Sequence, residues 1–167
     1  MPTLSLVVRP ERSEDDPAIE RLEARAFGPG RFARTAYRLR EGGRHRLDLG
    51  VTASVGSFLA GSVRMSPVRA GAVGFLMLGP LAVDPSFEGR GIGTALTSAA
   101  LDAARAAGEG LVILVGDAPY YARFGFGVVP PGHLALPGPV DPARFLWLEL
   151  TEGFAATVSG LVEPDRG

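Results

Sequence analysis

The 167-residue chain contains no cysteine, lysine, asparagine or glutamine. Without cysteine there is no thiol nucleophile, no disulfide framework and no thiolate metal ligand. The absence of lysine rules out a nucleotide-binding P-loop, which needs Gly-Lys before Ser or Thr. No apolar run approaches the 18 residues of a membrane-spanning helix, and the apolar run near the start is too short for a signal peptide. We therefore expect a soluble, cytoplasmic protein.

A large net charge is also lacking, because 17 arginines nearly balance 18 acidic residues and the formal net charge is -1. Such a chain has no global field to attract nucleic acid or an anionic membrane, so we expect neither as a partner. The use of arginine alone is interpreted as a bias in base composition. His45 and His133 stand apart without metal-ligand spacing, so packing or surface roles and no metal are expected.

What the sequence does contain is typical of a globular protein, with 46% hydrophobic and 21% charged residues. Its 23 glycines and 14 prolines are scattered along the chain, which favours many short elements joined by tight turns. There is no linker, repeat or low-complexity segment. The length and this pattern predict one mixed α/β (α+β) domain over residues 1–167.

The first 43 residues predict a strand and two helices. The run at 4–10 reads as a strand stopped by proline, and Ser13 is the expected N-cap of the first helix, which ends at 28–30. A second, arginine-rich helix is predicted over 31–43. The expected inward residues of the first helix are Ile19, Leu22, Ala26 and Phe27. Arg34, Arg38 and Arg40 do not share one face of the second helix, so a solvated surface is favoured over an acceptor pocket.

Three strand-like runs follow at 47–55, 57–68 and 72–83, and the glycines between them favour an antiparallel meander. A helix is then expected over 91–107. Its predicted inner residues are Ile92, Leu96, Ala99, Ala103 and either Ala106 or Ala107.

The rest of the chain predicts shorter elements. The apolar run at 111–116 is typical of a strand buried on both faces, and a short helix opens at Pro119. A C-terminal hairpin is expected over about 144–163, with Trp147 in the core or an interface. Its edge could pair with a second copy, which would give a homodimer.

The stretch "EGRGIGT" at 88–94 carries the main chemical signal. A helix N-terminus leaves backbone N–H groups unpaired, and glycines let a ligand approach them, so this turn suits a phosphate. Leu96 stands where a dinucleotide fingerprint needs a third glycine, so that motif fails. On the glycines alone, a turn without a ligand is an equally good interpretation.

The flanking residues favour a ligand. Gly79-Pro80 interrupts an otherwise good strand, which predicts a bulge or a missing ladder partner beside the glycine turn. Downstream, "YYARFGF" at 120–126 places a tyrosine pair on a short helix that ends in Gly-Phe.

The segments "LAVDPSFEGRGIGTAL" and "YYARFGF" resemble the GCN5-related N-acetyltransferase (GNAT) family. The resemblance implies a mostly antiparallel sheet of about six or seven strands, flanked by helices, with a splayed central strand pair. It implies an acetyl-CoA-binding core at about 47–130. Backbone amides would grip the pyrophosphate of acetyl-CoA, and a strand would pair with the pantetheine arm. The backbone amides would be those of Gly89, Arg90, Gly91, Ile92, Gly93 and Thr94. The strand that pairs with the pantetheine arm would be Leu81, Ala82 and Val83.

The family also commonly places a tyrosine four residues before the Gly-Phe pair as a general acid, which corresponds to Tyr121. Tyr120 is expected to line the acceptor site or to pack. Two positions depart from the family: Glu88 replaces the usual Gln or Arg, and no asparagine follows the fifth strand, where Asp117 lies instead. The general base is left open between Asp84, Asp117 and a water chain.

The resemblance implies transfer of an acetyl group from acetyl-CoA to a primary amine of a small molecule or peptide. No cysteine and no Gly-x-Ser-x-Gly elbow are present, so we expect direct transfer in a ternary complex, with an oxyanion donor near Ala82. Two alternatives stay open. One is a non-catalytic CoA-binding module, and the other is an acyltransferase that uses a longer acyl group or a hydroxyl acceptor.

Overall fold

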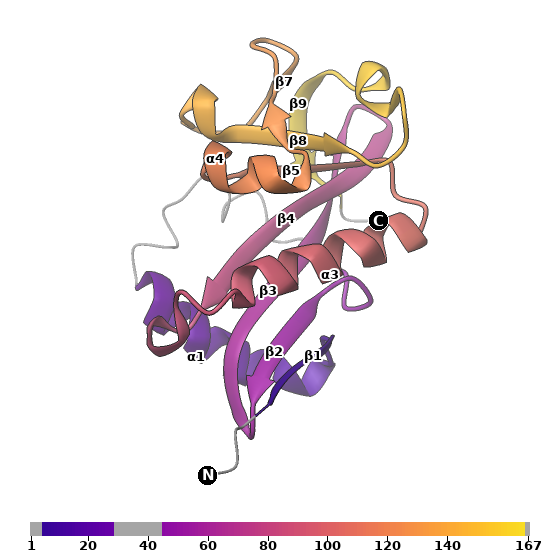
Figure 1. Cartoon of the computed structure of the whole chain (residues 1–167). Coiled ribbons are helices and arrows are strands. Elements are labelled where there is room, and N and C mark those ends of the chain that lie inside the picture. Colours follow the sequence, from indigo (N-terminus) through magenta and orange to yellow (C-terminus); the bar gives the residue numbers. More distant parts are fainter. Residues whose placement is uncertain (1–4, 29–44, 166–167) are drawn as a thin grey trace.

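The structure, a computed structural model, describes residues 5–28 and 45–165. The second helix expected over 31–43, with Arg34, Arg38 and Arg40, lies outside the described residues. Three α-helices interrupt the series of strands in the described part of the chain (Figure 1). They are β1 (Leu6–Pro10), α1 (Asp16–Phe27), β2 (Val51–Val55), β3 (Phe58–Ala70), β4 (Val73–Val83), α3 (Ile92–Ala106), β5 (Leu111–Val115), α4 (Ala118–Tyr121), β6 (Gly127–Val128), β7 (Leu134–Ala135), β8 (Phe145–Glu149) and β9 (Gly160–Pro164).

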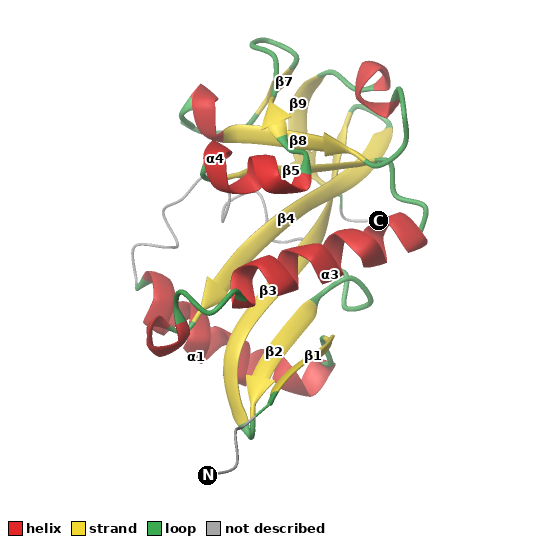
Figure 2. Ribbon diagram, in the orientation of Figure 1, coloured by secondary structure: helices red, strands yellow, loops and turns green. Residues whose placement is uncertain are grey.

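The strands form a mixed sheet in the order β1-β2-β3-β4-β5-β8-β6, and β9 pairs with β3 and with β7. Every pairing is antiparallel except β4–β5 and β7–β9. This confirms the predicted meander of β2, β3 and β4 and the mostly antiparallel sheet. The described residues form nine strands rather than the six or seven expected, and two of them, β6 and β7, have only two residues each. Figure 2 shows the strands in yellow.

The central parallel pair is splayed, as expected. β4 and β5 pair only at Leu76–Val112 and Met77–Ile113, after which β4 runs away from β5 (Figure 1). The divergence begins where the register between β3 and β4 shifts, because Gly79 and Pro80 together face one residue of β3. A proline has no N–H to donate to a neighbouring strand, so the predicted interruption of the ladder is confirmed.

Helices cover the two faces of the part of the sheet formed by β2, β3 and β4. In the view of Figure 1, α3 lies in front of these strands and α1 lies behind them. The α3 contact is close because Gly61 has no side chain: a Cβ there would lie 2.9 Å from Ile92 Cγ2 and from Leu96 Cδ1. On the opposite face, Ile19 and Leu22 of α1 are fully buried, as predicted.

Two local predictions for the helices need correction. The Ser13 side chain does not cap the first helix, because the chain first makes a 3₁₀ turn, Ser13–Asp15, in which Asp15 accepts the Arg12 N–H at 2.7 Å and pairs with Arg9. The predicted inner face of α3 is wrong only at its end, where Ala106 and Ala107 are exposed; Ile92 and Leu96 are buried as predicted, and Ala99 and Ala103 are partly buried against the core. Its buried residues are Ile92, Leu96, Thr97, Ala100, Leu101 and Ala104.

The predicted C-terminal hairpin over 144–163 is wrong as well, because β8 pairs with β5 and β6 whereas β9 pairs with β3 and β7. The intervening segment does not make a tight turn. It packs across the start of β5, where a Cβ on Gly110 would overlap the Phe154 ring. His133 Nε2 also lies 3.0 Å from Ala155 O and 2.7 Å from Val158 O, and these contacts hold the segment over the sheet.

Candidate cofactor site

The glycine turn has the geometry of an anion site. Gly89 and Gly91 both have φ of +77°, a left-handed conformation that favours glycine. Gly91 is the N-cap of α3, and no described side chain caps that helix. The first backbone N–H groups of α3 therefore point out of the helix end, beside the side chains of Arg90 and Thr94.

A buried carboxylate holds the chain that leads into this turn. Asp84 Oδ1 accepts the Ser86 N–H at 2.9 Å and so caps the 3₁₀ turn Pro85–Phe87. Its Oδ2 accepts a hydrogen bond of 2.8 Å from Arg25 Nε on α1. The backbone hydrogen bond from Ser86 and the Arg25 guanidinium hold the pKa of Asp84 below its usual value. The structure thus gives Asp84, one of the candidate general bases, a supporting role in the loop.

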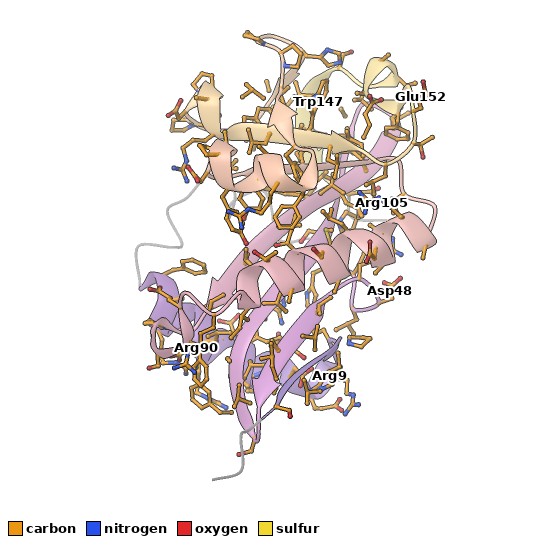
Figure 3. The ribbon with its side chains drawn as sticks, viewed as in Figure 1. Arg9, Asp48, Arg90, Arg105, Trp147 and Glu152 are labelled. Atoms are coloured by element: carbon orange, nitrogen blue, oxygen red, sulfur yellow. The ribbon has the colours of Figure 1, made fainter. Side chains whose placement is uncertain are left out.

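Aromatic rings hold Arg90 at the same end of α3. The rings of Phe58 and Phe87 stack with their centroids 5.6 Å apart. The Arg90 guanidinium carbon lies 5.1 Å from the centroid of Phe87, and that of Arg25 lies 5.5 Å from the centroid of Phe58. Figure 3 shows Arg90 and Arg105 at opposite ends of α3. A positive side chain therefore lies against the Phe87 ring, directly before the N-cap of the helix.

The strand residues named from the sequence lie next to the turn. Leu81 and Val83 follow the bulge in β4, and each has a side-chain atom 3.8 Å from where a Cβ on Gly93 would be. Ala82, which is 1% exposed, points to the opposite face of the sheet. Because β4 pairs with β5 only at Leu76 and Met77, the edge of β4 that faces β5 is open along 81–83. The turn and this open edge together could hold an extended ligand with a phosphate at one end.

The tyrosine pair lies across the splay from this edge. Asp117 Oδ2 accepts the Tyr120 N–H at 3.2 Å, so the other candidate base, Asp117, serves as the N-cap of α4. The Tyr120 hydroxyl lies 3.2 Å from Thr94 Oγ1 on α3. This contact was not anticipated, because the two residues are 26 positions apart and neither lies in a pattern that pairs them.

Tyr121 packs its ring against Phe126, with centroids 5.8 Å apart, and close over Gly116. Burial, with a smaller contribution from Tyr120, raises the pKa of Tyr121 to about 12. The phenol therefore keeps its proton at physiological pH, and a protonated group is what a general acid must be before it acts.

A further polar cluster lies between α1 and β3, and no pattern in the sequence predicts it. Arg64 Nη2 in β3 lies 3.2 Å from Glu11 Oε2 and 2.6 Å from Asp16 Oδ1, and His45 Nε2 lies 2.7 Å from the same Glu11 oxygen. Glu11 and Arg64 are buried. A charged residue inside a strand gives no periodic signal of its partners, which come from elements up to 53 positions away.

His133 and Trp147 pack together, whereas His45 contacts the buried Glu11 carboxylate. His45 and His133 make the contacts described above, and the His133 ring meets Trp147 edge to face with centroids 4.9 Å apart. Among residues 5–28 and 45–165 there is no group of three or more acidic or histidine side chains placed to hold a metal. In the same residues, no helix has the length and hydropathy to cross a membrane.

A model of the acetyltransferase (GNAT) family matches residues 17–126. The chain belongs to the GNAT acetyltransferase family. It is 32% identical over 160 residues to YhbS of Escherichia coli K12, an uncharacterized N-acetyltransferase, with 95% of both chains covered. The predicted family and the predicted fold class are both confirmed.

Two solved structures of GNAT proteins add to this finding. The crystal structure of Escherichia coli YhbS in complex with CoA has a TM-score of 0.83 and 30% identity, over 99% of this chain and 92% of that one. A GNAT acetyltransferase from Brucella melitensis in complex with acetyl-CoA has a TM-score of 0.62 and 28% identity, over 91% and 98% of the two chains.

Proposed function

We propose that the protein is an acetyl-CoA-dependent N-acetyltransferase that acts on a primary amine of a small molecule or peptide. The observation that carries the proposal is the position of the glycine-lined 89–94 turn beside the open edge of β4 at 81–83. The tyrosine pair of α4 reaches this turn through the Tyr120 hydroxyl, which lies 3.2 Å from Thr94 Oγ1. The similar structures from Escherichia coli and Brucella melitensis contain CoA and acetyl-CoA respectively, which supports this choice of substrate.

The residues fit the parts of acetyl-CoA in order. Backbone N–H groups of the turn, with Arg90 and Thr94, would hold the pyrophosphate, because an anion is stabilised at a glycine-lined helix N-terminus. The free edge of residues 81–83 would pair with the amides of the pantetheine arm, as a neighbouring strand does. The thioester would then lie where the strands diverge, close to Tyr121.

The chemistry we propose is direct. The neutral amine nitrogen attacks the thioester carbonyl carbon, and a backbone N–H near Ala82 stabilises the oxyanion that forms. The C–S bond then breaks, the Tyr121 hydroxyl gives its proton to the departing thiolate, and the tyrosinate regains a proton from solvent. No covalent acyl-enzyme is involved. The amine proton leaves through water, because both candidate carboxylates are engaged as caps.

We also propose that residues 1–167 act as one acetyltransferase domain in the cytoplasm, without nucleic acid or membrane as a partner. A homodimer is proposed on the sequence alone.

The two competing functions are a non-catalytic CoA-binding module and an acyltransferase for longer acyl groups or hydroxyl acceptors. Turnover of acetyl-, propionyl- and succinyl-CoA with a panel of amines separates all of these.

The first experiment is calorimetric titration with acetyl-CoA and CoA, with NADH and ATP as controls. Micromolar affinity for the CoA species alone is expected. Arg90→Glu should weaken CoA binding by about tenfold or more, because it places a negative charge beside the pyrophosphate. Arg105→Glu is the matched control, since it makes the same change at the other end of α3. An equal effect of both variants would mean that the turn is not the pyrophosphate site.

A further inference from the structure

The hydroxyl of Tyr120 lies over the first turn of α3. It is 3.2 Å from Thr94 Oγ1, and a Cβ on Gly93 would lie 3.2 Å from it. Tyr120 belongs to α4, on the β5 side of the splay, whereas Thr94 follows β4. The Thr94–Tyr120 contact therefore joins the two sides of the splay at the point where the helix amides are unpaired.

Other contacts hold the Tyr120 ring in place without its hydroxyl. Its backbone N–H is bound by Asp117, and its carbonyl accepts a hydrogen bond of 3.0 Å from Arg123 Nε. The Arg123 guanidinium carbon lies 4.4 Å from the ring centroid, and the Tyr121 ring meets Tyr120 edge to face at 4.9 Å. The hydroxyl is thus held in position by the rest of the residue rather than by its own hydrogen bond.

Two hydroxyl groups that share one hydrogen bond retain one unused O–H donor. Tyr120 and Thr94 each carry one O–H, and the single bond between them uses one hydrogen. The second O–H is free to donate to an acceptor at the helix end. A phosphate oxygen is the acceptor that this end of a helix favours, and a hydrogen bond to a charged oxygen is stronger than one between neutral groups.

We propose that Tyr120 binds the diphosphate of the acyl-CoA substrate through its hydroxyl, in a donor pair with Thr94. This inference rests on the proposed function and adds a substrate-binding residue to it. The two adjacent tyrosines then have separate roles. Tyr120 supplies affinity for the diphosphate, and Tyr121 supplies the proton for the leaving group.

The test measures ligand affinity by calorimetry in Tyr120→Phe. CoA and dephospho-CoA both carry the diphosphate, so both should bind about tenfold more weakly, which is about 1.4 kcal/mol. Acetylpantetheine lacks the diphosphate, so its affinity should stay within about twofold of the wild-type value. Tyr121→Phe makes the same chemical change one residue later and should leave CoA affinity within about twofold while lowering kcat.

A second variant guards against a folding effect. Thr94→Val removes the other hydroxyl, and the double variant should lose less CoA affinity than the sum of the two single losses, because both act through one bond. An unchanged CoA affinity in Tyr120→Phe, or an equal loss for acetylpantetheine, would overturn this inference and leave the proposed function standing. Failure of the unaltered protein to bind any CoA species would instead overturn the proposed function, and this inference with it.

Discussion

Asp84 allows the link between the 84–94 loop and the rest of the fold to be tested quantitatively. Asp84→Ala removes two interactions, the hydrogen bond from the Ser86 N–H and the charge-assisted bond from Arg25 Nε. A lost cap costs about 1 kcal/mol. The bond from Arg25 should add about 1 kcal/mol, at the low end of the range for charged groups, because the Arg25 side chain is 41% exposed and screened by solvent. We expect a total loss of about 2 kcal/mol in the free energy of unfolding.

Asp84→Asn divides this loss, because its amide oxygen can still accept the Ser86 N–H. About half of the effect of alanine is therefore expected for Asp84→Asn at pH 7. The carboxyl pKa is lower in the folded protein than in the unfolded chain, where it is about 3.9. Its contribution is thus complete above about pH 5, and it is lost as the pH falls through the folded pKa. The difference between wild type and Asp84→Asn should shrink at about pH 3.5.

Urea unfolding followed by circular dichroism measures these differences, and Asp48→Asn is the matched control. Asp48 also pairs with an arginine, at 2.7 Å from Arg46, and its pKa is also lowered, chiefly by the hydrogen bond from Arg46. Its side chain is 61% exposed, against 5% for Asp84. A surface pair contributes little, so a loss of under about 0.5 kcal/mol is expected. If Asp84→Ala cost no more than Asp48→Asn, the assignment of Asp84 as a support of the loop would be wrong.

Three other variants test the packing, the turn and the acid. Gly61→Ala should lower the free energy of unfolding by about 1–3 kcal/mol, because its Cβ would meet Ile92 and Leu96 at 2.9 Å; a stability unchanged in urea would contradict the close α3–β3 contact. Gly91→Ala meets no neighbouring atom but must hold φ near +77°, so a loss of about 1–2 kcal/mol is expected in the same assay. Tyr121→Phe should lower kcat at every pH between about 6 and 9, since a pKa of about 12 keeps the phenol protonated there; a loss confined to one limb of the profile would refute its role as the acid.

The sequence predicted the fold best where a pattern is local and continuous. The three runs between 47 and 83 became β2, β3 and β4, and the apolar run at 111–116 became the buried strand β5. The C-terminal strands were found, but their pairing was not, because strand periodicity says nothing about which neighbour a strand meets. β8 pairs with β5 rather than with β9, and the choice depends on how the segment at Gly110 and Phe154 packs.

The candidate site likewise has a part that local sequence patterns predict and a part that they do not. Its backbone parts, 81–83 and 89–94, are contiguous and carry glycines and a proline that local sequence rules interpret well. The side chains that support them come from distant elements: Arg25 lies 59 positions from Asp84, and Tyr120 lies 26 positions from Thr94. No single-sequence pattern encodes such contacts, so the sequence alone leaves Asp84 open as a base although its carboxylate supports the loop.

The backbone part of the candidate site is predictable from the sequence because of how the ligand would be held. A site made of backbone N–H groups needs a particular chain path rather than particular side chains, so a short run with glycines at the left-handed positions is enough to specify it. It also explains how Glu88 is tolerated where Gln or Arg is usual. Glu88 is exposed at the end of the 3₁₀ turn, whereas Arg90 is held by Phe87 beside the helix amides. The positive end of α3 and Arg90 therefore outweigh one solvated carboxylate. On this argument Glu88→Gln should leave CoA affinity equal or slightly tighter by calorimetry, and a marked loss would mean that the carboxylate itself is used.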